Sequence, residues 1–151
     1  MAYDAVIAGA RGLFFFGGHL TPVMTPQDRV RGWNWTYWRT VQRPVIEELS
    51  GPAHAQALLA PDAPFAVHPS ATDIALSARQ TKDAIYVIAV RRSPSASGRV
   101  RFDGLPASIT KGTVLSHGPS NPQRPITVSG GAFTDPSPWR PHNARVYRFA
   151  R

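Results

Sequence analysis

The stretch from Ile74 to Val90 reads IALSARQTKDAIYVIAV and contains two strand patterns separated by a polar turn. In the first part apolar and polar residues alternate, which is typical of a half-buried strand. The second part, Ala84 to Val90, is a continuous apolar run. Because Thr81–Asp83 supplies a short turn between them, the stretch predicts a β-hairpin. The alternating positions are Ile74, Leu76 and Ala78 on one face, and Ala75, Ser77 and Arg79 on the other.

Shorter strand patterns follow the hairpin at intervals of about ten residues, with turns rich in Pro, Gly and Ser between them. This spacing predicts a sandwich of antiparallel sheets over residues 61–151. The apolar residues that mark these strands are Val100, Phe102, Ile109, Val114, Leu115, Ile126, Val128, Phe133 and Val146 to Phe149.

The first 60 residues have a different texture. Apolar residues at helical spacing predict a helix from Ala2 to about Gly12. The run Leu13–Phe16 that follows is apolar at every position, as in strands of parallel sheets that helices cover on both sides. One helix and one strand cannot cover both faces of that strand, so we expect the segment to need neighbours that lie outside this sequence.

A second helix is predicted from Trp35 to Leu49, where apolar residues recur every three or four positions. Pro44 lies in its middle, so we expect the helix to kink there or to begin its regular part there. Gly51-Pro52 should end it, and Ala53–Pro64 is interpreted as a linker. The fold class is therefore mainly β, an antiparallel β-sandwich with an N-terminal α/β segment.

The order of these elements resembles a known family. The stretch Ala2–Gly18 resembles the last helix-strand step of (β/α)8-barrel glycoside hydrolases. The sandwich resembles the small C-terminal domain that follows the barrel in many of them, with Val100–Pro106 and Gly131–Asp135 similar to its later strands. The resemblance implies that residues 1–60 are the terminal helix-strand-helix of a truncated barrel and residues 61–151 the C-terminal sandwich.

The resemblance also implies where a substrate would bind. Active sites of such barrels lie at the C-terminal ends of the strands and in the loops after them. His19, Asp28, Trp33 and Trp35 occupy that position, and the tryptophans offer flat faces that stack on sugar rings. We therefore expect one wall of a carbohydrate site here. A structural role for His19 and a place for Trp35 in the helix core remain alternatives.

Catalysis is not expected on this chain alone. Glycoside hydrolysis needs two carboxylates roughly 5–10 Å apart, and the nine acidic residues, most of them at turns and helix ends, offer no convincing pair. No cofactor or metal site is expected, because there is no Cys, no phosphate-binding loop, and no pair of His at ligand spacing. The chain is predicted to be a C-terminal fragment of a glycoside hydrolase-like protein. The alternative is a self-standing, non-catalytic β-sandwich that serves as a binding or interaction module.

The formal charge of +8 raises the question of nucleic acid. Fifteen of the 17 basic residues are Arg, and they are scattered along the chain, whereas nucleic-acid surfaces cluster them. The longest strongly apolar run is far too short to cross a bilayer. We therefore expect neither nucleic acid nor membrane as a partner. The expected partners are carbohydrate, bound through the parent barrel, and the missing barrel itself.

Overall fold

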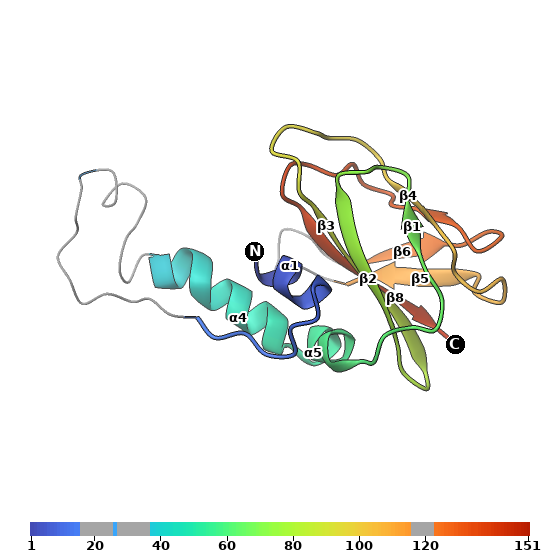
Figure 1. The fold of residues 1–151 in the computed structure, drawn as a ribbon, viewed down its shortest axis with the longest axis horizontal. Coiled ribbons are helices and arrows are strands. Elements are labelled where there is room, and N and C mark those ends of the chain that lie inside the picture. The colour runs from blue at the N-terminus through green and yellow to red at the C-terminus, as the bar shows by residue number, and fades with distance from the viewer. Residues whose placement is uncertain (16–25, 27–36, 116–122) are drawn as a thin grey trace.

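The computed structural model describes residues 1–15, 26, 37–115 and 123–151. Two antiparallel sheets face one another, and short helices lie beside the larger sheet (Figure 1). The strands are β1 (His68–Pro69), β2 (Ile74–Gln80), β3 (Ala84–Arg91), β4 (Arg101–Asp103), β5 (Lys111–Val114), β6 (Arg124–Thr127), β7 (Phe133–Thr134) and β8 (Ala144–Ala150). The helices are α1 (Ala2–Ile7), the π-helix η1 (Trp38–Gln42), α4 (Arg43–Ser50) and α5 (Pro52–Leu59).

The predicted hairpin is confirmed as β2 and β3, which pair in register from Ile74 opposite Arg91 to Gln80 opposite Ile85. The five-stranded sheet has the order β2-β3-β8-β5-β6, and the three-stranded sheet has the order β1-β4-β7. Strand β3 is buried along its whole length, because it has strands on both sides, the other sheet on one face and helices on the other. The mainly β fold class with an antiparallel sandwich is confirmed.

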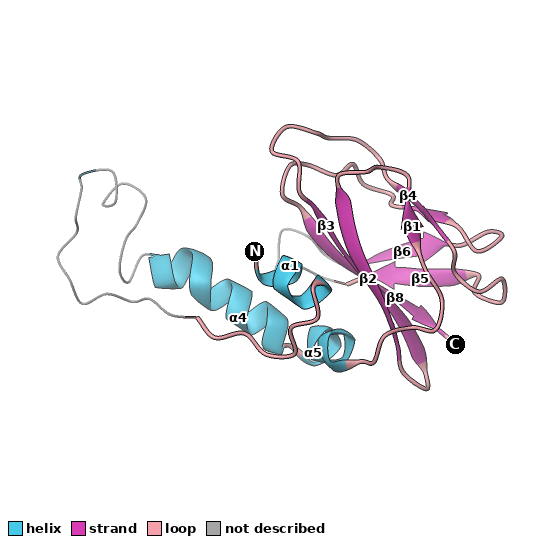
Figure 2. Ribbon diagram, in the orientation of Figure 1, coloured by secondary structure: helices cyan, strands magenta, loops and turns pink. Residues whose placement is uncertain are grey.

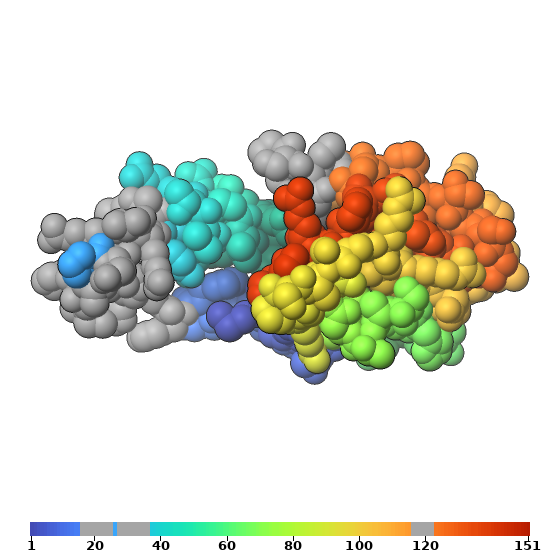
Figure 3. All heavy atoms as spheres, turned by 90° about the horizontal axis from the view of Figure 1, so that it is seen from above, coloured from blue at the N-terminus to red at the C-terminus, as the bar shows by residue number. Residues whose placement is uncertain are grey.

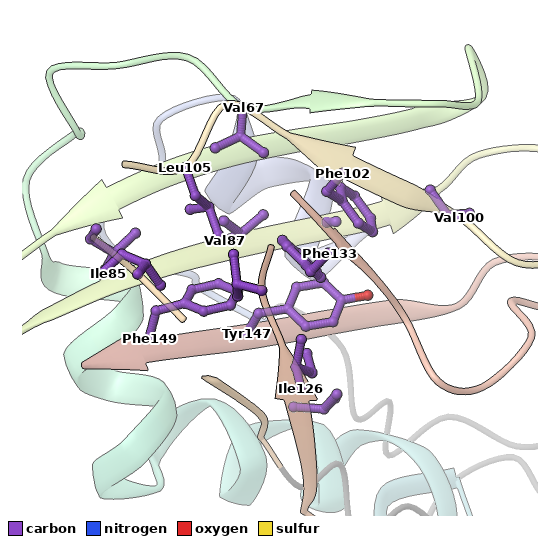
Figure 4. Packing of buried hydrophobic residues seen from close by; sticks show 14 of the residues in the cluster. Val67, Ile85, Val87, Val100, Phe102, Leu105, Ile126, Phe133, Tyr147 and Phe149 are labelled. Carbon is purple, nitrogen blue, oxygen red and sulfur yellow. The ribbon is translucent and has the colours of Figure 1, made fainter. Parts of the chain in front are cut away.

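Aromatic rings fill the space between the two sheets (Figure 4). The Phe102 and Phe133 rings stack with their centroids 4.9 Å apart, and Tyr147 lies edge-on to Phe133 at 5.0 Å. Phe149 extends the cluster toward β5, where it covers Gly112. A Cβ atom added at Gly112 would lie 2.3 Å from the Phe149 ring, so glycine is required there for the two strands to carry this core.

The helices lie on the opposite face of the five-stranded sheet, as the division between helices and strands in Figure 2 shows. α1 contacts β2 and β3, α5 contacts β8, and α4 contacts α5 and η1. In Figure 3 α4, drawn in cyan, lies to one side of the sandwich strands. The helical layer is therefore anchored to the sheet through α1 and α5, whereas α4 extends from it.

The helices of the N-terminal part have bounds that the sequence predicted only in part. Pro44 lies in the first turn of α4, directly after the π-helical turn η1, so the regular α-helical part begins at the proline. The predicted linker Ala53–Pro64 is wrong in its first half, because Pro52–Leu59 forms α5, again with a proline in the first turn. The first helix is shorter than predicted and ends at Ile7.

The strand predicted over Leu13–Phe16 is not formed in the part that the structure describes. Leu13, Phe14 and Phe15 have no strand assignment, and no pairing involves them. Phe16 lies outside the described residues. A strand exists only where a second strand takes up its backbone hydrogen bonds, and residues 13–15 have no such neighbour among the described elements.

Candidate functional site

The four residues predicted to line a carbohydrate site, His19, Asp28, Trp33 and Trp35, all lie outside the described residues. The wall that they were expected to form therefore remains a prediction. The feature that the described part does show is an apolar groove beside the segment that leads to them.

The groove is built on a second hydrophobic cluster, which joins the helices to the outer face of the five-stranded sheet. Tyr3 and Val6 of α1 and Ala57 of α5 pack against Tyr86 and Ile88 of β3. The outer faces of β2 and β3 carry small residues at Ala75, Ser77 and Ala84, which allow helices to approach closely. The sandwich and its helical layer thus share one buried interface.

The groove itself has a volume of about 450 Å³ and lies among residues 10–15, α4 and α5. Its lining is almost wholly apolar, with Arg11 and Ser50 as its polar members. Phe14 is 92% exposed and Leu59 66% exposed, so large apolar side chains at the groove are left in solvent. The lining residues are Val6, Ala10–Phe15, Ile46, Leu49, Ser50, Ala55, Leu58 and Leu59.

A surface of this kind suits an apolar partner better than a sugar. Sugar sites need several polar groups that converge on hydroxyls, whereas contiguous exposed apolar side chains mark protein contact surfaces. Trp38 and Val41 on η1 are also exposed, at 37% and 43%, although their spacing predicted a buried face. The helical layer therefore leaves several large apolar side chains exposed that its own contacts do not bury.

Polar contacts fix the helical layer in place. The Tyr3 hydroxyl donates a hydrogen bond to Glu48 and so ties α1 to α4. Burial, followed by the charge of Glu48, raises the pKa of Tyr3 well above its usual range. Asp4 accepts a hydrogen bond of 2.9 Å from Arg92, beside the end of β3, and this bond lowers the pKa of Asp4.

The sequence pattern did not predict the burial of Arg79. Its place in the alternation of β2 predicted a polar, outward-facing residue, yet it is fully buried beneath α1 and α5. Ala75 and Ser77 share the outer face of β2 with Arg79, and a strand face made of Ala, Ser and one Arg can accept a helix. These small residues were the signal in the sequence that Arg79 could be covered.

Five carboxylates of the described part form ion pairs with arginines. Among them, Asp4 has its pKa lowered by its hydrogen bond from Arg92, whereas a catalytic acid needs a raised pKa. These contacts support structural roles. The pairs are Asp4–Arg92 at 2.9 Å, Glu47–Arg43 at 2.7 Å, Asp62–Arg11 at 3.6 Å, Asp73–Arg91 at 2.9 Å and Asp135–Arg145 at 2.5 Å.

A second groove, of about 530 Å³, lies between the edge strands β6 and β7. Arg101, Thr127, Ser129 and Thr134 give it a polar lining, and Phe133, its aromatic lining residue, is buried in the core. It therefore lacks the flat aromatic face on which sugars stack.

Among the described residues no group of His, Cys, Asp and Glu could hold a metal ion. Within the same ranges no helix has the length and apolar character needed to cross a membrane.

Comparison with known proteins gives a coarse similarity in structure. No protein-family model matches the sequence, and no curated protein matches it. Among solved structures, a GH30 endoxylanase from Clostridium papyrosolvens is similar, with 16% sequence identity and a TM-score of 0.40 over 54% of this chain. The chain spans about a fifth of that enzyme, 21% of its length. A TM-score this low describes a partial likeness in fold and says nothing of substrate or reaction.

Proposed function

We propose that this chain is the C-terminal accessory part of a glycoside hydrolase-like protein, and that its helical layer packs against a (β/α)8 catalytic barrel. The observation that carries the proposal is the exposure of Phe14 and Phe15 in the described part of the apolar run that begins at Leu13. Its composition is that of a strand buried on both faces, yet Phe14 is 92% exposed and Phe15 38% exposed.

Energetics favour an apolar occupant for this surface. Burying one such side chain contributes about 1.5–3 kcal/mol, so leaving Phe14 and Leu59 in water forgoes a sizeable share of stability. A barrel would supply a neighbouring strand for residues 13–16 and apolar helices for the groove. The need for a neighbouring strand and the need for an apolar cover both arise at residues 13–15 and the groove beside them. A barrel would meet both needs at once, which favours it over an unrelated docking partner.

In this proposal the chain contributes to a sugar site without catalysing the reaction. His19, Asp28, Trp33 and Trp35 would form one wall of the pocket, and the catalytic carboxylates would come from earlier strands of the barrel. The cation-paired carboxylates of the described part are consistent with this division of roles.

The purified chain provides the first test. It should not hydrolyse aryl glycosides or xylo-, cello- and manno-oligosaccharides, and it should self-associate through the exposed phenylalanines. Sedimentation velocity over a concentration series should show association that the double change Phe14→Ser and Phe15→Ser abolishes. Val41→Ser is the matched control, because Val41 is 43% exposed but does not line the groove. Hydrolysis by the pure chain would overturn the proposal.

The DNA immediately upstream of the Met1 codon provides the second test. An in-frame stretch that encodes seven further strand-helix units would establish the parent barrel. A stop codon directly before Met1, with no barrel gene nearby, would contradict it.

A self-standing binding or interaction module is the second candidate. It is favoured by the helical layer itself, since α1 and α5 already cover the outer sheet face with a buried cluster of their own. The module predicts a chain that stays monomeric at all concentrations. Persistent monomers together with the absence of an upstream barrel would favour the module over the fragment.

A further inference from the structure

Arg79 is a buried cation in an unusual place. It projects from β2 away from the inter-sheet core and has no exposed surface. Burying a charge is costly unless hydrogen bonds compensate for the lost water. Burial, with the nearby charge of Arg11, lowers the pKa of Arg79, but a guanidinium remains charged at neutral pH.

The compensation comes from the ends of two helices. Nη2 of Arg79 donates to the carbonyl oxygen of Val6 in α1 at 2.6 Å, and Nη1 donates to the carbonyl oxygen of Leu58 in α5. Both carbonyls lie in the last turns of their helices, where the helix dipole is negative. The Val6 carbonyl also accepts a hydrogen bond of 3.0 Å from the backbone N–H of Gly9, so Arg79 is its second donor. The nearest acidic group is Asp62, 3.9 Å away, and it is 76% exposed. Backbone carbonyls are therefore the main partners of this cation.

The same two residues line the apolar groove. Val6 and Leu58 lie on α1 and α5, so the fork of Arg79 sets the spacing between two of its walls. Arg11 adds bonds to Ala60 at 2.9 Å and to Leu58 at 3.4 Å. The Arg11 side chain is 45% exposed, however, so its bonds compete with water and count for less.

We infer that Arg79 is the positioning residue through which the β-sandwich fixes the shape of the apolar groove. Its planar fork holds α1 and α5 at one separation, and the groove exists in its observed form because both helices are bound to the same guanidinium. The groove is present in the described structure, so this role does not depend on the barrel. Only the identity of the partner rests on the proposed function.

Hydrogen exchange in the full chain tests the inference with Arg79→Met and Arg79→Lys. The methionine keeps most of the apolar volume and removes both bonds, whereas lysine keeps the charge and lacks the planar fork. Amides of α1 and α5 should exchange at least tenfold faster in Arg79→Met, and amides of β3 and β8 should change less than twofold. Arg79→Lys should show the same pattern to a smaller degree.

Arg148→Met is the matched control, because Arg148 is an exposed arginine on β8 of the same sheet. It should leave exchange unchanged everywhere. A second readout is the self-association through Phe14, which should weaken at least fivefold in Arg79→Met even where the thermal midpoint of the sandwich is retained. Equal acceleration in helices and strands, or none in α1 and α5, would overturn the inference. If Arg79→Met does not fold, the pattern in Arg79→Lys decides.

The outcome is separable from that of the proposed function. A missing upstream barrel would remove the partner and leave the exchange result intact. Unchanged helices in Arg79→Met would remove the role of Arg79 and leave the barrel proposal intact.

Discussion

The two faces of the five-stranded sheet are stabilised in different ways. On the inner face, large rings interlock: Phe102, Phe133 and Tyr147 have centroids 4.9–5.4 Å apart and are fully buried. On the outer face, a second apolar cluster that includes Tyr86 and Ile88 packs against α1 and α5, and polar contacts such as those of Arg79 and Tyr3 also hold the helices. The inner face is complete in itself, whereas the outer face ends in an open groove. The ring packing therefore closes the inner face, whereas the helical layer leaves apolar surface exposed on the outer face.

Phe102 on the inner face and Phe14 beside the outer face should show the largest difference between the two sides of the sheet. Phe102→Ala should reduce the free energy of unfolding by about 3–5 kcal/mol, since it removes a ring from the centre of the core and leaves a cavity. Phe14→Ala should change it by less than about 0.5 kcal/mol, because that ring is 92% exposed. Urea denaturation of both variants gives the two values. A large loss for Phe14→Ala would mean that the outer layer also depends on ring packing.

A buried polar contact within the core should have the next largest effect. The Tyr147 hydroxyl donates to Oδ2 of Asp135 at 2.6 Å, and Arg145 lies 2.5 Å from the same carboxylate. Burial raises the pKa of Tyr147, so the hydroxyl keeps its proton and remains a donor. Tyr147→Phe should cost about 1.5–3 kcal/mol, the usual range for a bond to a charged group. Thermal unfolding gives the value, with Tyr86→Phe as the control, because the Tyr86 hydroxyl donates to the uncharged side chain of Gln56 at 3.2 Å and its loss should cost less. No measurable loss in Tyr147→Phe would show that Arg145 and the backbone N–H of Ser137 satisfy Asp135 without the hydroxyl.

The inner face was well predicted from the sequence. The alternation at Ile74–Ala78 and the continuous run at Ala84–Val90 are local patterns, and each corresponds to one strand of the observed hairpin. Strands marked by single residues such as Phe133 were also located, because turn residues bound them. The ends of the strands were predicted less well. Ile109 was predicted to mark a strand but lies just before β5, which begins at Lys111, where pairing with Thr127 begins.

The outer face could not be predicted to the same degree, because its contacts join residues far apart in the chain. Nothing near Arg79 in the sequence indicates that Val6, 73 positions earlier, will accept its hydrogen bond. The helix at Pro52–Leu59 was missed because its sequence is apolar on most sides and has no clear period. The predicted wall of His19, Asp28, Trp33 and Trp35 stays a prediction, since it lies outside the described residues.

Tyr3 provides a matched test on the outer face. Like Tyr147 it donates to a carboxylate, here that of Glu48, but it joins two helices, whereas Tyr147 joins β8 to the residue after β7. Tyr3→Phe should cost about 1 kcal/mol, and the effect should be local to α4. Cleavage after Glu47, inside α4, by a glutamate-specific protease should therefore accelerate several-fold while the urea midpoint of the sandwich shifts little. Equal changes in both readouts would show that the two layers unfold as one unit.

The smallest expected effect concerns Asp4 and its dependence on pH. Arg92 lowers the pKa of Asp4 in the folded chain, so the carboxylate contributes stability above its ordinary pKa of about 3.9 and loses it as pH falls through the folded value. Because Asp4 and Arg92 are 32% and 60% exposed, Asp4→Asn should cost only a few tenths of a kcal/mol at pH 7. The difference from the unchanged chain should shrink below about pH 4 and in about 1 M salt, where the attraction is screened. A difference that persists under both conditions would mean that Asp4 acts on α1 through neutral hydrogen bonding, and that electrostatic attachment to β3 is not what holds the first helix to the sheet.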